Sequence, residues 1–422
     1  MAATMPDREI EVVVCLGRDE VLAGKLWSHR RRGIESMTFS YDAGYIELPD
    51  AYELDPSLPL FTGGHQTPTG REIFGAFSDS VPDRWGRRLI ARTETKRSKR
   101  DGTAQRSFGE IDYLLGVRDD LRQGALRFRE PGIDDFLASE STGVPAFVGL
   151  PKLLSAAEHL EQGEENEEDL ALLLRGGSSL GGARPKAHVI GQGGRIAIAK
   201  FPSPGADEWD VMRWEYVALQ LARESGIKVP DFELQEVDGK PVLVVYRFDR
   251  AADLRIGYAS AMTMLGLRDD DRASYLDIGE VISNESPHAT DDLHELWRRM
   301  AFSVVISNFD DHLRNHAFLR KTSAGWSLSP AFDMNPDPGP GERHLHTAID
   351  HEDTSASVDL LIDVAAEFRL TEEAALRVLG EVSAATSRWR QVAEPVGLER
   401  EIDLMEPAFE HEAAIRARDL AA

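Results

Sequence analysis

The chain has 422 residues, which is long enough for two or three domains that each bury a core of their own. Its formal net charge of -25 argues against direct binding to nucleic acid or to an anionic membrane, so any role on DNA would need a basic partner. Because Cys15 is the one cysteine, no intrachain disulfide can form, and we expect a reducing, cytoplasmic location. The sequence predicts neither a signal peptide nor a membrane span.

The N-terminal part of the chain is predicted to form strands and then helices. Strand signals separated by polar or Gly-containing turns occur at 9–17, 21–27, 36–42 and 44–48. Helical spacing of apolar residues follows at 75–97 and at 108–117. The acidic run 158–170 has no apolar face, which makes it a linker candidate, with a solvated helix as the alternative.

The rest of the chain alternates between strands and helices. The predicted strands are 186–190, 196–201, a hairpin around Asp238 and Gly239, and a second hairpin at 316–320 and 326–330. The predicted helices are 208–226, ended by Gly226, a second one from Asp291 on with apolar residues at helical spacing as far as Val304, and C-terminal helices after an N-cap at Thr371. The charged segment 267–277 is predicted to be a solvated loop with no assigned chemistry.

Four polar elements follow one another in an order that suits phosphoryl transfer. They are a Gly-rich turn at 176–186, Lys200 at a strand end, the polar loop 306–319, and Asp333 after a hairpin. Backbone N–H groups of a Gly-rich loop can approach phosphate oxygens closely, and a Lys neutralises them. Magnesium prefers hard oxygen ligands, among them one or two carboxylates. The sequence therefore predicts a site for phosphoryl transfer with Mg²⁺ as a ligand.

The polar loop 306–319 places two Asp, two Asn, two His and one Arg between apolar segments. Asp310, His312 and Asn315 form the pattern D-x-H-x-x-N. Asp310 is the expected catalytic residue that orients the acceptor hydroxyl or takes its proton, and His312 is expected to brace the loop through hydrogen bonds. Asn315 and Asp333 are the expected metal ligands, with Asp333 as the main carboxylate, like the Asp of D-F-G in protein kinases.

These residues and their order resemble the HipA-like serine/threonine kinases of bacterial toxin–antitoxin systems. The kinase-domain resemblance lies in SSLGGARPKA, IAKFPSP, VYRFDR, NFDDHLRN and LSPAFDMNP, and FSDSVPDRWGRRLI and GALRF resemble the N-terminal domain. The resemblance implies an α+β, two-lobed fold related to protein kinases and phosphatidylinositol kinases, with a β-rich N-terminal subdomain and a helical C-terminal lobe. The expected domains are 1–145 for the N-terminal subdomain, 146–248 for the ATP-binding part and 249–422 for the helical catalytic lobe.

The resemblance also implies an activity and partners. It implies transfer of the ATP γ-phosphate to a Ser or Thr of a protein, with aminoacyl-tRNA synthetases among the family's targets and stalled translation as the toxic effect. A helix-turn-helix antitoxin is the implied partner, through which DNA would be contacted only indirectly. Family members autophosphorylate their phosphate loop, and Ser178 and Ser179 lie at the matching place.

Residue by residue, Lys200 matches the lysine that holds the nucleotide phosphates, Asp310 matches the catalytic aspartate, and Asn315 and Asp333 match the metal ligands. The expected nucleotide-binding residues are Ser179, Leu180, Gly181, Gly182, Ala183, Lys186, Lys200, Asn315 and the hinge residues Tyr246, Arg247 and Phe248. Arg314 stands where many members have Lys, which preserves charge but changes geometry.

Two nucleotide-binding positions stay open on the sequence alone. Tyr246 replaces a common hinge Glu, which leaves the adenine contacts open. Glu215 is either the ion-pair partner of Lys200 or a solvated helix residue.

Other functions could use the same residues. A small-molecule kinase would act on a sugar, an aminoglycoside or a lipid head group, and a nucleotide-binding corepressor would act with a DNA-binding partner without turnover. A metal hydrolase built from Asp310, His312, His316 and Asp333 would leave the Gly-rich turn and Lys200 unexplained.

Overall fold

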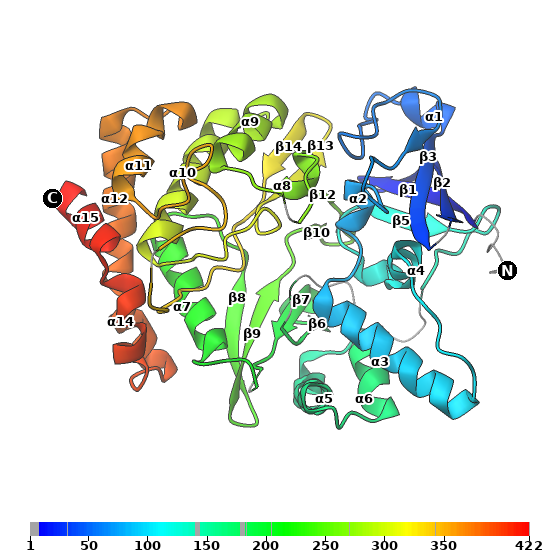
Figure 1. Ribbon diagram of the computed structural model, residues 1–422, viewed down its shortest axis with the longest axis horizontal. Helices are drawn as coiled ribbons and strands as arrows, with labels where there is room; N and C mark the ends of the chain where they lie inside the picture. Colours follow the sequence, from blue (N-terminus) through cyan, green and yellow to red (C-terminus); the bar gives the residue numbers. More distant parts are fainter. Residues whose placement is uncertain are drawn as a thin grey trace. The chain divides into compact units, whose positions relative to one another are not determined.

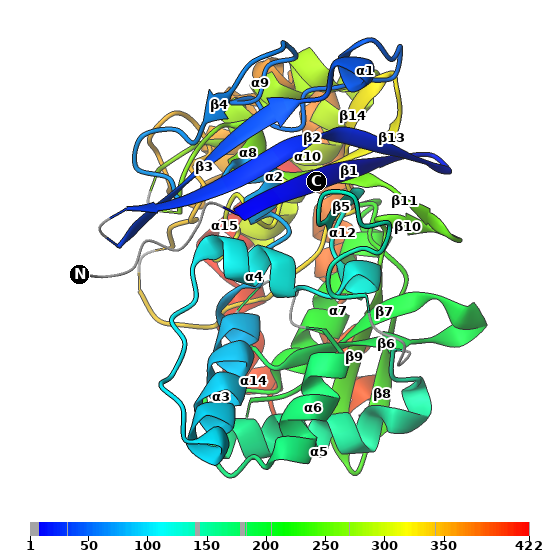
Figure 2. The ribbon, with the colours of Figure 1, turned by 90° about the vertical axis from the view of Figure 1, so that its right-hand side faces the viewer.

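The computed structural model describes residues 8–31, 33–139, 144–177, 182, 184–203, 205–269, 271–341 and 343–421. The chain divides into two compact units. The first comprises Met1–Gly205 together with Val237–Gly239 and Asp249–Ala259, and the second comprises Ala206–Glu236, Lys240–Phe248 and Ser260–Ala422. Figures 1 and 2 show the course of the chain. In the described ranges, no helix is both long and apolar enough to cross a membrane.

The first unit begins with an antiparallel sheet in the order β4-β3-β2-β1-β5, whose strands are labelled in Figure 2. Its strands are β1 (Arg8–Leu16), β2 (Asp19–Arg31), β3 (Ile34–Tyr41), β4 (His65–Gln66) and β5 (Leu126–Arg129). Alternate residues of β3 are buried, as expected for a strand with one face on a core. The three strands predicted at 9–17, 21–27 and 36–42 are confirmed.

The strand predicted at 44–48 is wrong, because α1 (Ala43–Ile46) occupies this place. The Asp42 side chain accepts a hydrogen bond from Gly44 N and caps the helix. The hydroxyl of buried Tyr45 donates to Tyr52 O over 2.9 Å. A local cap and a tyrosine anchor therefore override the strand propensity of this segment.

The helices of the first unit are α2 (Gly75–Ser78), α3 (Arg84–Asp101), α4 (Glu110–Gly116), α5 (Leu150–Gln162) and α6 (Glu167–Arg175), with short 3₁₀ turns at 119–121, 147–149 and 192–194. Helix α6 packs against both α5 and α3. The acidic run 158–170 is helical at both ends, with Gly163 (φ 77°) ending α5 and Asn166 capping α6. The segment is therefore two helix ends joined by a short turn, and because Leu160 and Leu170 are buried it is neither a linker nor a single solvated helix.

Two short hairpins complete the first unit. The strands β6 (Lys186–Ile190) and β7 (Ile196–Lys200) pair antiparallel, as predicted. The second hairpin, β10 (Arg250–Ala251) with β11 (Leu254–Arg255), is followed by β12 (Gly257–Ser260).

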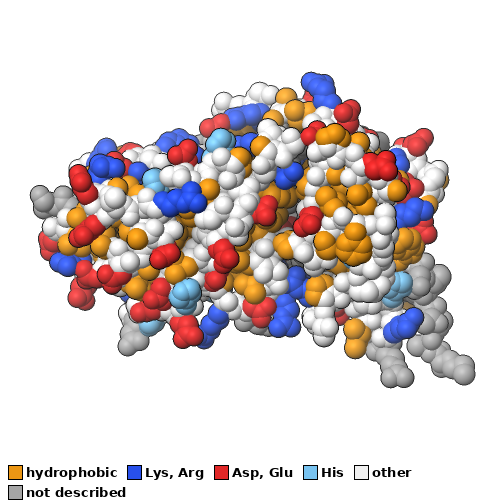
Figure 3. Space-filling model, turned by 90° about the horizontal axis from the view of Figure 1, so that it is seen from above, with side chains coloured by type: hydrophobic (Ala, Val, Ile, Leu, Met, Phe, Trp, Pro, Cys, Tyr) orange, Lys and Arg blue, Asp and Glu red, His pale blue; other side chains and the backbone are white. Residues whose placement is uncertain are grey.

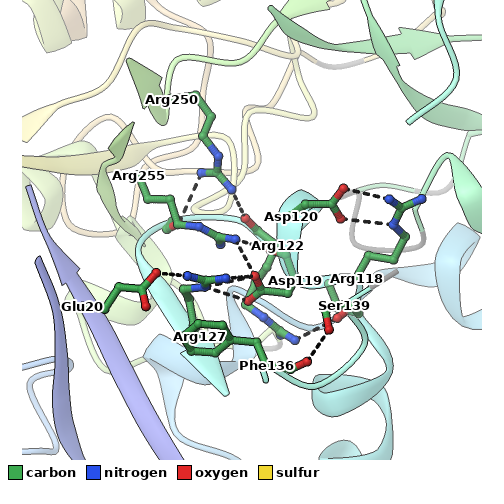
Figure 4. Close-up of polar contacts among 12 residues, drawn as sticks. Glu20, Arg118, Asp119, Asp120, Arg122, Arg127, Phe136, Ser139, Arg250 and Arg255 are labelled. Carbon is green, nitrogen blue, oxygen red and sulfur yellow. Dashed lines mark hydrogen bonds and ion pairs between the residues drawn. The ribbon is translucent and has the colours of Figure 1, made fainter. Parts of the chain in front are cut away.

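An ion network holds the second hairpin, and Figure 4 shows Asp119 among the arginines that surround it. Asp119 Oδ2 accepts from Arg127 Nε at 3.0 Å and from Arg255 Nη2 at 2.9 Å, and Asp249 Oδ2 accepts from Gly124 N at 2.8 Å. The segment 249–259 is thus fastened to the turn at 119–124.

The second unit is mainly helical. Its elements are α7 (Val211–Glu224), β8 (Phe232–Val237), β9 (Lys240–Tyr246), α8 (Ala261–Met264), α9 (Tyr275–Glu285), α10 (Ala289–Val305), β13 (Ala317–Thr322), β14 (Gly325–Leu328), α11 (Val358–Asp363), a 3₁₀ turn (Ala365–Phe368), α12 (Glu372–Thr386), α13 (Trp389–Ala393), a 3₁₀ turn (Glu394–Val396), α14 (Ile402–Phe409) and α15 (Glu412–Ala421). Helix α10 packs against α9, α11, α12 and α15, and Figure 1 shows α15 beside α12. The helix predicted from Asp291 on is confirmed as α10, and the predicted N-cap at Thr371 is confirmed.

Candidate active site

The polar loop joins α10 to β13 in the second unit. Its flanks, Ile306 and Ala317, are fully buried, whereas Asp310 at the tip is exposed. Ser307 begins the loop with φ 57°, a left-handed conformation that is uncommon outside glycine. The loop is therefore anchored at both ends and presents one carboxylate to solvent.

Hydrogen bonds within the loop fix the backbone of Asp310. Its carbonyl accepts from His312 N at 3.0 Å and from Asn315 Nδ2 at 3.0 Å, and Asn315 N donates to His312 O at 2.8 Å. Because Nδ2 of Asn315 is held on this carbonyl, Oδ1 is the amide atom that can face a metal ion, and amide oxygen is a suitable ligand for Mg²⁺. His312 braces the loop through its backbone N–H.

The segment that contains Asp333 is tied to the beginning of the same loop. Asn335 N donates to Asn308 Oδ1 over 3.1 Å, and Asp337 N donates to Ser307 O over 3.1 Å. Asp333 itself has φ 59°, a conformation that costs free energy for a residue with a side chain. Such strain persists where the surroundings hold it, and it often marks a functional position.

A buried network that the sequence analysis missed lies directly after Asp310. Asp311 Oδ1 is 3.1 Å from His316 Nε2, and Asp311 Oδ2 accepts hydrogen bonds from the Tyr275 hydroxyl and, at 3.3 Å, from Ser303 Oγ. Burial raises the pKa of Asp311, but the nearby His316 and the hydrogen bonds outweigh burial and hold this pKa below its usual value. Asp311 is therefore a buried carboxylate that the surrounding donors keep ionised.

The prediction of a solvated, inactive loop at 267–277 is wrong at its C-terminal end. Ser274 caps α9, and Tyr275 is fully buried with its hydroxyl on Asp311. The clue in the sequence was Tyr275 itself, a large aromatic residue after a capping serine. At the other end of the segment, Asp269 accepts a hydrogen bond from Arg314 Nε at 2.8 Å. This bond holds Arg314, the residue found here in place of the more common Lys, at the surface of the loop.

Part of the Gly-rich turn lies outside the described residues, namely Ser178, Ser179, Leu180, Gly181 and Ala183. Of the described residues, Gly177 has φ 83°, and a Cβ there would lie 2.7 Å from Leu121 Cδ1. Gly182 has φ 88°, and a Cβ there would lie 2.7 Å from Lys186 Nζ. The positive φ favours glycine at both positions, and at Gly177 the neighbouring Leu121 side chain also leaves little space for a Cβ.

Two lysines lie opposite each other at the open end of the hairpin, where β6 begins and β7 ends. Lys186 of β6 and Lys200 of β7 are direct cross-strand partners, so their side chains lie on the same face of the hairpin. Like charges at such positions repel each other, and an anion bound beside them offsets the repulsion. In a chain of net charge -25, two lysines are thus direct neighbours at the end of the hairpin that follows the Gly-rich segment.

The hinge residues belong to the second unit. Tyr246 N donates to Asp231 O over 2.8 Å and the Tyr246 hydroxyl donates to Glu233 Oε1 over 2.6 Å, so both of its donors are committed within the protein. The ring of Phe248 lies 5.5 Å from that of Phe332, the residue before Asp333. Glu215 is 2% exposed, which excludes a solvated helix position for it.

Two of the residues that a metal hydrolase would need, His316 and Asp310, lie in different surroundings. His316 pairs with Asp311 inside the protein, whereas Asp310 is exposed. Across the described part of the chain, no group of three or more His, Cys, Asp or Glu side chains is placed to hold a metal ion. One carboxylate with an amide oxygen, as in Asp333 and Asn315, is a smaller set that suits Mg²⁺ with phosphate and water as the other ligands.

Two family models match the chain. The HipA-like C-terminal domain matches residues 178–389, and the HipA N-terminal domain matches residues 14–106. The first match covers half of the chain and contains the polar loop, Asp333 and both lysines.

Curated relatives and a solved structure are similar to this chain. A putative kinase, Y4dM, of Sinorhizobium fredii is 30% identical over 152 residues, which are 32% of this chain and 36% of that protein. A putative kinase of Haemophilus influenzae is 24% identical over 187 residues, which are 37% of this chain and 52% of that protein. The chain thus matches only about a third to a half of the length of these relatives.

The structural match extends over nearly the whole chain. The Shewanella oneidensis HipA structure, solved as a complex of HipA, HipB and operator DNA, has a TM-score of 0.67 and 15% identity, covering 98% of this chain and 96% of that one. At this identity the likeness concerns the fold, and it confirms the predicted α+β, two-lobed, kinase-like fold. With both family models matched in chain order, the chain belongs to the HipA-like family.

Proposed function

We propose that this protein is an ATP- and Mg²⁺-dependent protein serine/threonine kinase and the toxin of a toxin–antitoxin pair. The main observation in its favour is the polar loop, where Asp310 is exposed on a backbone that His312 and Asn315 hold by hydrogen bonds. A carboxylate that must meet a substrate hydroxyl needs both access to solvent and a fixed direction. The relatives named putative kinases support the same activity.

Asp310 orients the acceptor hydroxyl and receives its proton. As the hydroxyl oxygen bonds to the γ-phosphorus, the bond from that phosphorus to the β,γ-bridging oxygen breaks and ADP leaves. Lys186 and Lys200, paired across the hairpin, neutralise phosphate charge together with backbone N–H groups of the Gly-rich turn. Asn315 and Asp333 would hold Mg²⁺, which supplies charge neutralisation on the phosphates when bound.

The proposal includes a substrate and a partner, both taken from the resemblance to the family. We place a translation component such as an aminoacyl-tRNA synthetase as the substrate, in the cytosol, and a basic helix-turn-helix antitoxin as the partner. The Shewanella HipA was solved with HipB and operator DNA. Acidic side chains are scattered over the face drawn in Figure 3, and they suit a basic partner better than they suit DNA.

Transfer of labelled phosphate tests the activity. Protein expressed as wild type and as Asp310→Asn is incubated with γ-labelled ATP, Mg²⁺ and a lysate, and labelled proteins are identified by mass spectrometry. A discrete labelled protein with wild type only supports the proposal. A labelled small molecule without labelled protein would favour the small-molecule kinase, and nucleotide binding without any transfer would favour the corepressor.

We also propose autophosphorylation at Ser178 or Ser179. A phosphate there adds about -1.5 to -2 charges next to the site for ATP phosphates, so the modified protein should bind ATP weakly. Peptide mass spectrometry of wild type and Asp310→Asn tests this. Phosphate on either serine in wild type alone is the expected result, and its absence from wild type under saturating ATP and Mg²⁺ would contradict it.

A further inference from the structure

Helix α3 begins beside the Gly-rich turn of the same unit, and its N-cap residue faces this turn. Asp83 is the N-cap residue, yet among the described residues its side chain makes no capping bond to its own helix. Its Oδ2 instead accepts a hydrogen bond from Gly182 N at 2.5 Å. An Asp at an N-cap ordinarily bonds the second or third N–H of its helix. Here the carboxylate bonds a residue 99 positions away.

Trp85, in the first turn of α3, makes two more contacts with the same segment. Its indole Nε1 donates to Lys186 O over 3.0 Å, and its backbone N donates to Gly182 O over 3.4 Å. The Trp85 side chain is 1% exposed, so the indole is enclosed where it makes this bond. The first residues of α3 therefore form hydrogen bonds with Gly182 and with Lys186, the first residue of β6.

The hold on Gly182 also fixes the surroundings of the Lys186 ammonium. A Cβ at Gly182 would lie 2.7 Å from Lys186 Nζ, so this ammonium lies directly against the Gly182 backbone. Lys186 is in turn the cross-strand partner of Lys200. A shift of Gly182 would therefore move its backbone relative to Lys186 and Lys200, the two lysines proposed to hold the phosphates.

We propose that Asp83 is a positioning residue for nucleotide binding, supplied by the N-terminal domain to the Gly-rich turn of the kinase domain. The proposal rests on the proposed function, because it takes the turn and the two lysines as the place of the ATP phosphates. Asp83 lies within the region that matches the HipA N-terminal domain, and Gly182 lies within the region that matches the HipA-like C-terminal domain. A charge-assisted bond between the two regions keeps Gly182 in place beside Lys186, in the position that ATP binding requires.

Two substitutions at Asp83 in the full-length chain separate this role from helix capping. Asp83→Ser keeps a good N-cap but has a side chain too short to reach Gly182, whereas Asp83→Asn keeps an acceptor at the same reach without the charge. Arg92→Ala, at an exposed position on the same helix, is the matched control. Thermal unfolding without nucleotide shows whether each variant folds as wild type does.

The dissociation constant for ATP is then measured by calorimetry, independently of phosphate transfer, together with KM for ATP and kcat. We expect Asp83→Ser to weaken ATP binding and to raise KM about tenfold with little change in kcat, Asp83→Asn to lose about threefold or less, and Arg92→Ala to match wild type. ATP binding by Asp83→Ser equal to wild type would overturn the inference. If no variant, wild type included, transfers phosphate while ATP still binds, the proposed kinase activity fails, and the binding constants still decide the role of Asp83.

Discussion

Asp311 and His316 form a buried pair next to the exposed Asp310, with His316 Nε2 3.1 Å from Asp311 Oδ1. The same carboxylate accepts from the Tyr275 hydroxyl, and Thr347 Oγ1 donates to the Asp311 carbonyl over 2.6 Å. Asp311 therefore ties the loop that presents Asp310 to the buried side chains of His316, Tyr275 and Thr347. Asp310 is thus exposed at the tip of the loop, and the next residue, Asp311, anchors the loop inside the protein.

Asp311→Ala should destabilise the second unit and lower the rate of transfer. The substitution leaves His316 and Tyr275 without their shared acceptor, and removing one partner of a buried pair costs about 3–5 kcal/mol. Urea unfolding gives the free energy, and kcat at saturating ATP gives the effect on catalysis. Asp269→Ala, which removes an exposed partner of Arg314, serves as the control and should cost less than about 1 kcal/mol. Equal stabilities of the two variants would contradict the account of Asp311.

We expect the free energy of unfolding to fall in mild acid because of His411. Burial, with Arg343 nearby, lowers the pKa of His411 to about 4, while its Nε2 donates to Val305 O at 3.0 Å. Since the pKa is about 6.5 in the unfolded chain, folding favours the neutral imidazole. The contribution of His411 is therefore complete above pH about 6.5 and is lost as pH falls toward 4, by about 3 kcal/mol.

Denaturant unfolding between pH 4 and pH 7 measures this effect. His411→Gln keeps a donor for Val305 O but does not titrate, so its stability should vary less across the interval. The same slope in wild type and in His411→Gln would show that other groups cause the acid sensitivity.

Asp333→Asn should reduce the gain in ATP affinity that Mg²⁺ provides. Asn tolerates the left-handed φ of 59° as Asp does, so this variant removes the charge and leaves the backbone in place. Calorimetry with and without Mg²⁺ should show the enhancement reduced by about tenfold or more, because a carboxylate supplies most of the protein's charge at such a metal. An undiminished Mg²⁺ effect would exclude Asp333 as a ligand.

Asp119→Ala should destabilise the first unit. Asp119 is 4% exposed and is shared by Arg127 and Arg255, and its removal leaves these guanidinium groups close together without the carboxylate between them. We expect a loss of about 3–5 kcal/mol in urea unfolding. Glu20→Ala removes an exposed partner of the same Arg127 and should cost less than about 1 kcal/mol. A small effect of Asp119→Ala would mean that the network is solvated.

The sequence predicted those parts of the fold that local patterns encode. Helix α10 and the N-cap at Thr371 follow from apolar spacing and cap chemistry within a few residues. The segment 44–48 was misread because a cap at Asp42 outweighs strand propensity. The apolar residues around the loop likewise predicted that its flanks would be buried, as Ile306 and Ala317 are.

Contacts between distant residues could not be predicted in this way. Tyr275 meets Asp311 across 36 residues, and Asp83 meets Gly182 across 99 residues. Neither pair leaves a periodic signal, because each depends on how whole elements pack. The support of the loop and the bond to the Gly-rich turn were therefore visible only in the structure.

Phosphate transfer by the Asp310→Asn variant tests the central claim most directly. Asp310 is exposed and holds no nucleotide in this account, so the variant should fold, bind ATP with Mg²⁺ as wild type does, and transfer labelled γ-phosphate to protein at a rate lowered by about 100-fold or more. A rate within about tenfold of wild type, which corresponds to a change of about 1.4 kcal/mol in the barrier, would contradict the account.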